Sequence, residues 1–249
     1  MQLQGQVALV TGGSRGIGRA TALAFAGEGA DIAFCHFNDD AQAETTAADI
    51  RALGRRVMHL SADVADPAAT RNFAQRATDT LGAPDIVFNN AGMNTRKPFE
   101  DYTEEEFDRL IGVHLKGMFF MAQAVYPGMV ARGRGCIINI ASQMGLKGGP
   151  NAVPYCAAKA GIIGLTRALA CAPRGCGSMR SRLGRSTQTW SARIARSGRQ
   201  HSALGCRPAG SGESRRSPQP RCCSPARRAG SMSAPACRRT AVTLCIEYQ

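Results

Sequence analysis

Short apolar runs alternate with amphipathic runs over the first two thirds of the chain. The apolar runs are short and bounded by glycine or polar residues, as buried strands are, and the others repeat their apolar residues at helical spacing. We predict strands at 6–10, 31–37, 56–64, 85–92 and 135–143, and helices at 19–30, 39–54, 66–82, 103–133 and 154–172. This alternation predicts an α/β fold of three layers, with helices on both faces of a doubly wound parallel sheet.

Charge and cysteine content divide the chain near residue 175. The chain has 249 residues and a net charge of +13. Residues 1–175 hold 17 Lys and Arg against 16 Asp and Glu, whereas residues 176–249 hold 14 arginines against two acids. Four cysteines precede residue 176 and six follow it. We therefore expect a near-neutral domain at 1–175 and a separate Arg/Ser/Pro/Cys-rich tail at 176–249.

The sequence also bears on compartment and metals. It enters a strand-like run directly, without the pattern of a signal peptide, and no apolar stretch has the length of a membrane span. We expect a cytoplasmic protein with free thiols and no membrane partner. We expect no metal site, because the cysteines form no C-x-x-C pair and have no histidines at metal-binding spacing.

The segment TGGSRGIG at 11–18 lies between the first predicted strand and the first predicted helix. Glycines let the backbone approach a pyrophosphate, and the helix start supplies free N–H groups and a positive dipole end. An ordinary tight turn is the alternative, but the position between strand and helix favours a dinucleotide loop. The candidate cofactor-binding residues here are Gly12, Ser14, Arg15, Gly16, Ile17 and Gly18.

The end of the second strand should select between the two nicotinamide cofactors. An acid there would bind the 2′-hydroxyl of NAD and repel the 2′-phosphate of NADP. The sequence reads CHFN at 35–38, with no acid until Asp39, and Arg15 adds a positive charge nearby. This pattern favours NADP(H) over NAD(H), with a solvated loop charge as the alternative role of Arg15.

Tyr155 and Lys159 are four residues apart on one predicted helix and therefore share a face. A nearby ammonium favours the phenolate and lowers the pKa of a tyrosine, which can then exchange a proton with a substrate oxygen. Ser142 ends a predicted strand at the sheet edge where ligands bind, and its hydroxyl can hold that oxygen. Each residue also has a purely structural interpretation: Tyr155 as an aromatic residue at the rim of the core, Lys159 as a solvated charge and Ser142 as a turn residue.

Taken in order and spacing, TGGSRGIG, NNAG at 89–92, Ser142 and YCAAK at 155–159 resemble the classical short-chain dehydrogenases/reductases. The likeness covers about residues 3 to 175. It implies a Rossmann fold, an NAD(P)(H) cofactor, a Ser142–Tyr155–Lys159 centre, a small alcohol or carbonyl substrate, and a homotetramer or homodimer. Within the family, reductases of 3-oxoacyl thioesters are the first expectation, and sugar or polyol dehydrogenases the second.

The resemblance implies further site residues. Asp63 and Val64 would lie along the adenine, and Asn90, Ala91 and Gly92 would pack beside the adenosine ribose and steady the sheet. The family pattern has asparagine, anchoring a proton-relay water, where this chain has His114 in the segment VHLKG. Histidine can also bind a water and titrates near neutral pH, so an altered relay and a structural histidine are both open interpretations.

After the helix at 154–172 the family pattern implies another strand, a substrate-covering segment and a last strand. Read one base out of register, the codons for Gly177 to Trp190 can encode RVNAVAPGPVDTDM, which continues that pattern. Those for 238–247 can encode PPNGGHVMY and a stop. We interpret 176–249 as a frameshifted segment, with one base lost near Gly175, that is poorly structured and supplies no parallel strand.

An arginine-rich tail could instead be a disordered segment that binds nucleic acid. Its aromatic residues are only Trp190 and Tyr248, it lacks lysine, and its six cysteines are unusual for such an arm. These features argue against nucleic-acid binding. The sequence thus leaves an NADP(H)-preferring oxidoreductase as the first hypothesis and a catalytically inactive frameshift product as the second.

Overall fold

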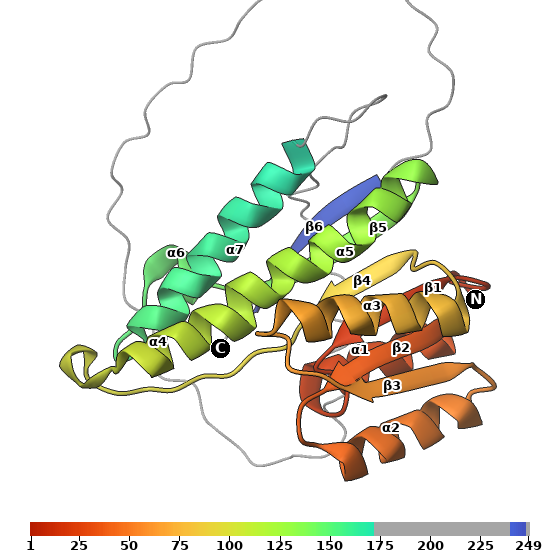
Figure 1. Ribbon diagram of the computed structural model, residues 1–249, viewed down its shortest axis with the longest axis horizontal. Coiled ribbons are helices and arrows are strands. Elements are labelled where there is room, and N and C mark those ends of the chain that lie inside the picture. Colours follow the sequence, from red (N-terminus) through yellow and green to blue (C-terminus); the bar gives the residue numbers. More distant parts are fainter. Residues whose placement is uncertain (172–239, 248–249) are drawn as a thin grey trace, which may run out of the picture.

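The computed structural model of the protein describes residues 1–171 and 240–247. Six parallel strands form one sheet in the order β3-β2-β1-β4-β5-β6 (Figure 1). The strands are β1 (Val7–Thr11), β2 (Asp31–His36), β3 (Val57–Ser61), β4 (Ile86–Asn89), β5 (Gly135–Ser142) and β6 (Thr240–Glu247). The predicted doubly wound α/β fold is confirmed.

The predicted helices are present, the one at 103–133 in two parts, and a short helix at 144–147 was not predicted. The helices are α1 (Gly16–Gly27), α2 (Asp40–Ala52), α3 (Pro67–Leu81), α4 (Glu104–Ile111), α5 (Gly117–Ala131), α6 (Met144–Lys147) and α7 (Val153–Cys171). Two short pieces complete the set, the 3₁₀ turn η1 (Phe99–Asp101) and the π-helical turn η2 (Gly112–Lys116). Local signals define two of the helix starts: Asp66 accepts a hydrogen bond from the Ala68 N–H at α3, and Thr103 and Glu106 form a capping box at α4.

The apolar core lies in two layers, one on each face of the sheet. On one face, Phe25 of α1 and Ile50 of α2 pack against strand residues such as Ile32. On the other, Phe73 of α3 and Met121 of α5 pack against residues of β1, β4 and β5. Because both faces are covered, all five residues of β1 are buried. This explains why the strands are continuously apolar rather than alternating.

Strand register brings the expected site to one edge of the sheet. Thr11 pairs with Asn89, and Asn89 pairs with Asn139, so β1, β4 and β5 run in step toward their carboxyl ends. The chain order reverses between β1 and β4, and open α/β sheets bind ligands in the crevice outside such a switch point. The glycine loop follows β1 at this edge, and Ser142 ends β5 there.

The predicted helix at 103–133 contains a feature that periodicity did not reveal. The helix runs through α4, the π turn η2 and α5, and Pro127 lies within α5. A π turn inserts one extra residue into a helix and is frequent at functional sites. Here the turn contains His114 and buries its side chain.

The sixth strand corrects one expectation. The prediction that residues 176–249 supply no parallel strand is wrong for 240–247, because β6 pairs with β5 from Gly135–Thr240 to Ser142–Glu247. The run TAVTLCIE is rich in residues with high β propensity, and the edge of β5 offers backbone groups that a strand can pair. The rest of the predicted tail, 176–239 and 248–249, lies outside the described residues.

Candidate active site

The glycine loop packs too tightly for side chains at two positions. A Cβ on Gly18 would lie 2.0 Å from the carbonyl oxygen of Gly12, and one on Gly13 would lie 2.5 Å from the Cβ of Phe34. Gly12 also adopts a φ of +67°, a conformation that favours glycine. The sequence therefore needs glycine here to turn from β1 into α1 against the neighbouring strands.

The start of α1 is open to an anion. Arg15 is its N-cap residue and gives no side-chain cap, and the first turn contains no acidic residue. The backbone N–H groups of that turn have no intrahelical partners and stand at the positive end of the helix dipole. Ile17 is partly exposed on the same turn. The loop and the helix start therefore fit the pyrophosphate of a dinucleotide.

Asp39 folds back onto the glycine loop. Its carboxylate accepts a hydrogen bond from the Ser14 hydroxyl at 2.7 Å and lies 3.8 Å from Nε of Arg15. The Arg15 side chain is 80% exposed and that of Asp39 only 20% exposed. The sequence reasoning placed Asp39 too late in the chain to act as an acid at the ribose. Its return to Ser14 depends on the turn after β2, which periodicity does not predict.

The turn after β4 fastens the glycine loop to the sheet. The backbone N–H groups of Asn90 and Ala91 both donate to the Thr11 hydroxyl at 3.0 Å. The Asn90 amide donates to the carbonyl oxygens of Thr11 and Gly12 at 3.1 and 3.2 Å. The NNAG segment thus holds the loop in place.

Asp63 and Val64 lie just beyond the carboxyl end of β3. The Asp63 carboxylate accepts from the Ala65 N–H at 2.9 Å and pairs with Arg109 of α4 at 2.5 Å. Val64 is buried and packs against Gly117, where a Cβ would approach the Val64 carbonyl oxygen to 2.8 Å. The two residues join the loop after β3 to the α4–α5 helix.

Ser142, Tyr155 and Lys159 are all inaccessible, with exposed fractions of 0%, 4% and 2%. The Ser142 hydroxyl accepts from the Met144 N–H at 3.2 Å. Lys159 donates to the carbonyl oxygen of Ile140 at 2.7 Å, and its Nζ lies 5.4 Å from the centre of the Tyr155 ring. The structure therefore brings the ammonium of α7 against both the phenol and the strand that ends in Ser142.

His114 belongs to the same group of side chains. Its ring meets that of Tyr155 edge to face, and its Nε2 lies 2.6 Å from the carbonyl oxygen of Met93. Burial, and then the charge of Lys159, lower the pKa of His114 to about 4. A Cβ on Gly92 would lie 2.6 Å from the ring, which explains the glycine there. Burial and the nearby ammonium of Lys159 therefore disfavour the charged imidazole.

Sequence reasoning did not identify Asn139. Its side-chain oxygen accepts from the Asn89 amide at 2.9 Å, and its own amide donates to the Thr166 hydroxyl at 3.0 Å. These buried contacts fix β4, β5 and α7 relative to one another. A polar residue inside the run CIINIAS was the signal that could have indicated it.

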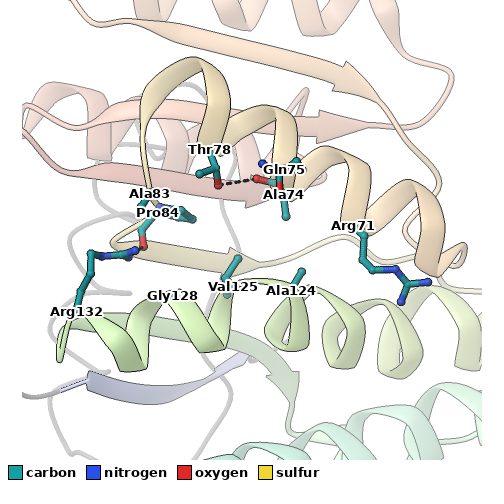
Figure 2. A pocket seen from close by; sticks show the side chains of 10 residues that line it. All are labelled: Arg71, Ala74, Gln75, Thr78, Ala83, Pro84, Ala124, Val125, Gly128 and Arg132. Atoms are coloured by element: carbon teal, nitrogen blue, oxygen red, sulfur yellow. Dashed lines mark hydrogen bonds between the residues drawn. The ribbon is translucent and has the colours of Figure 1, made fainter.

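A separate cavity of about 330 Å³ lies between α3 and α5 and contains none of the expected site residues. Figure 2 shows Arg71 and Arg132 at its two ends. Arg132 donates to the carbonyl oxygen of Pro84 at 2.6 Å, and Arg71 lies over the ring of Phe120 at 5.6 Å.

Among the described helices, none is long and apolar enough to cross a membrane.

Comparison with known proteins agrees with this geometry. The family model of the short chain dehydrogenases matches residues 6–175. The chain is 41% identical over 170 residues to (2S)-[(R)-hydroxy(phenyl)methyl]succinyl-CoA dehydrogenase subunit BbsD of Thauera aromatica, covering 68% of each chain. It is 42% identical over 168 residues to a sorbitol dehydrogenase of Cereibacter sphaeroides, covering 67% of this chain and 64% of that one.

A third relative is a 3-oxoacyl-[acyl-carrier-protein] reductase of Staphylococcus aureus, 37% identical over 163 residues and covered to 66% in both chains. The matched part spans 64 to 68% of the length of these three relatives. The family match at 6–175 includes the glycine loop and Ser142, Tyr155 and Lys159. It gives no support for any function of the last third of this chain.

Proposed function

The chain belongs to the classical short-chain dehydrogenase/reductase family, and from this premise we propose that it interconverts a secondary alcohol and a ketone. The burial of Tyr155 with Lys159 beside the end of β5 is the observation that carries the proposal. The family implies NAD(P)(H), and the tight glycine loop with an uncapped helix start fits such a cofactor.

Each of the three side chains has a distinct task in this proposal. When bound, the nicotinamide supplies or accepts the hydride. Ser142 donates a hydrogen bond to the substrate oxygen and orients it. In ketone reduction Tyr155 gives its hydroxyl proton to that oxygen, and in alcohol oxidation the phenolate takes the proton back. Lys159 stabilises the phenolate by its charge.

The matching experiment replaces Tyr155 by Phe, which keeps the ring and removes the proton. We expect NAD(P)(H)-dependent turnover of a ketone or secondary alcohol to fall by about 100-fold or more, the range of general acid–base contributions. Tyr126→Phe, on α5, is the matched control and should retain turnover. Equal turnover by the two variants would contradict the assignment of Tyr155.

We propose a 3-oxoacyl thioester as the first substrate class and a sugar or polyol as the second. A thioester is consistent with similarity to an acyl-carrier-protein reductase and to a CoA-ester dehydrogenase, and a polyol with similarity to a sorbitol dehydrogenase. Assays with a 3-oxoacyl thioester, and with sorbitol in the oxidative direction, separate the two classes. Activity on the polyol alone would reverse the order.

For the cofactor, we propose that the preference for NADP(H) rests on Arg15 and is weakened by Asp39. The guanidinium is mostly exposed and can approach a 2′-phosphate, whereas the nearby Asp39 carboxylate competes for the guanidinium and repels that phosphate. The enzyme should therefore accept both cofactors, with a modest preference for NADP(H).

We also propose a cytoplasmic homotetramer or homodimer, as the family implies. Phe107 of α4 and Phe119 of α5 each expose nearly half of their surface, and apolar side chains exposed on neighbouring helices suit a contact between subunits. Replacing both by serine should shift the protein to monomers in light scattering. An unchanged oligomer would place the interface elsewhere.

Residues 176–249 motivate a second proposal, that this chain is a catalytically inactive product of a frameshift. The frameshift interpretation removes the family's substrate-covering segment from the encoded sequence. Resequencing the gene around codon 175 tests the interpretation, and a chain with the restored frame should gain activity. Intact original codons there would refute the frameshift. A salt-dependent affinity for nucleic acid, lost on truncation at residue 175, would instead favour the nucleic-acid alternative.

A further inference from the structure

His114 replaces the asparagine that the family pattern implies, and it does so inside a π-helical turn next to Tyr155. We propose that His114 is a positioning residue: a neutral imidazole that fixes the Met93 backbone through Nε2–H, holds the Tyr155 ring, and offers Nδ1 to one ordered water. The inference rests on the proposed function, because Tyr155 is the residue that is positioned.

The shorter of two contacts favours a hydrogen on Nε2. Nε2 of His114 lies 2.6 Å from the carbonyl oxygen of Met93, whereas the Met93 N–H points at the same nitrogen from 3.2 Å and would need an Nε2 without a hydrogen. A carbonyl oxygen can only accept, so the shorter contact requires a hydrogen on Nε2. In the neutral ring Nδ1 is then an acceptor without a hydrogen.

The surroundings of the ring favour its neutral form. His114 is 2% exposed. The turn after β4 brings the backbone of Gly92 and Met93 against it, and α7 brings the Tyr155 ring and the Lys159 ammonium. A second positive charge there would be desolvated and repelled by Lys159. The ring therefore acts through packing and hydrogen bonds and does not exchange protons during turnover.

The hydrogen-bonding state of the His114 Nδ1 atom points to a ligand. This atom is buried and has no hydrogen-bond partner among the described residues. A buried acceptor is destabilising when it is left unpaired, and none of the described residues supplies its donor, so a small bound donor suits this position. Water suits this position because it can donate to Nδ1 and accept a hydrogen bond in return.

Two substitutions separate the hydrogen bonds from the ring. His114→Asn keeps a donor and an acceptor on a shorter side chain, whereas His114→Phe keeps an aromatic ring against Tyr155 and removes both nitrogens. The matched control is His59→Asn, a half-buried histidine of β3 that contacts His36 and Glu44.

The first measurement is ¹⁵N NMR of the imidazole nitrogens in the full-length chain, which needs no turnover. We expect protonated Nε2 and unprotonated Nδ1, unchanged between about pH 6 and pH 8, the range in which an ordinary histidine titrates. An imidazolium, or a hydrogen on Nδ1, would overturn the proposal. This readout is independent of whether the chain reduces ketones.

The second measurement is steady-state kinetics on the same variants. We expect His114→Phe to lower kcat by about 100-fold, as small misplacements of reacting groups do, with KM changed by less than about threefold. His114→Asn should recover most of the loss, and His59→Asn should match the unsubstituted chain. Full kcat in His114→Phe, or equal losses in the Asn and Phe variants, would refute positioning by hydrogen bonds. If the unsubstituted chain does not turn over, the NMR result alone decides.

Discussion

The rings of His114 and Tyr155 meet edge to face, with centroids 5.2 Å apart and planes at 89°. Both residues are buried, and Lys159 contacts the same phenol from α7. Because the imidazole is neutral, the ammonium supplies the positive charge that stabilises a phenolate in this group. The imidazole packs against the phenol ring and forms hydrogen bonds.

Replacing Lys159 by Met should separate charge from packing. Met fills a similar volume without the ammonium, so the phenolate loses its stabilisation and, in the direction of alcohol oxidation, the acidic limb of the kcat/KM profile moves to higher pH. At neutral pH we expect a loss of about 100-fold. Lys147→Met, in α6, is the control, and an equal loss there would show that the effect is not specific to the site.

The acid stability of the fold should depend on His114. Its folded pKa of about 4 lies below the value of 6.5 for a free histidine, so the unfolded chain binds more protons as pH falls. The free energy of unfolding therefore decreases between pH 6.5 and 4, by ~3 kcal/mol from this residue.

Urea unfolding of His114→Asn and of the unsubstituted chain at neutral and acid pH measures this difference. The variant should lose less stability on acidification. Burial also lowers the pKa of His36, so His36 contributes to the acid loss with the same sign and remains in both proteins. Parallel pH dependences would contradict the low pKa of His114.

Asp39 should control cofactor choice. Asp39→Asn removes the charge that repels a 2′-phosphate and frees Arg15, so the ratio of kcat/KM for NADPH over NADH should rise about tenfold, or ~1.4 kcal/mol. Asp40→Asn is a matched control, because that carboxylate is 84% exposed and one residue away. A similar change in both variants would indicate a general charge effect, and no change in Asp39→Asn would exclude Asp39 as a selector.

Two glycines of α1 should respond oppositely to alanine. Gly18→Ala places a Cβ against the Gly12 carbonyl oxygen and should cost more than ~2 kcal/mol of unfolding free energy, in the range of overpacked cores. A Cβ at Gly27 meets nothing within 4 Å, so Gly27→Ala should stabilise by ~0.5–1 kcal/mol. Urea denaturation of both variants decides the point. Similar stabilities would show that the loop can relax.

Much of this molecule could be predicted from its sequence because local pattern and fold agree. Short apolar runs located five strands to within a few residues, and a strand–glycine–helix junction indicated the candidate anion site. Tyr155 and Lys159 were placed together by helical spacing alone.

The remaining features depend on contacts between distant parts of the chain. The turn after β2 brings Asp39 to Ser14. The spacing of apolar residues does not indicate the π turn that buries His114. The sixth strand pairs with β5 from a segment more than 90 residues further along the chain, so no local pattern could assign its partner. Composition suggested a structureless tail, and eight residues of it form a strand.

Cofactor binding tests the account most directly, since it needs no substrate and no turnover. Titration of the full-length chain with NADPH should saturate at one site per chain. Gly16→Asp places a carboxylate at the start of α1 and should weaken binding by more than about tenfold through repulsion of the pyrophosphate. Gly54→Asp is the control, because Gly54 also has a positive φ, +72° against +57° for Gly16, and equally open surroundings, and this variant should bind as the unsubstituted chain does. Absence of saturable binding, or equal binding by the two variants, would contradict a dinucleotide site at this loop.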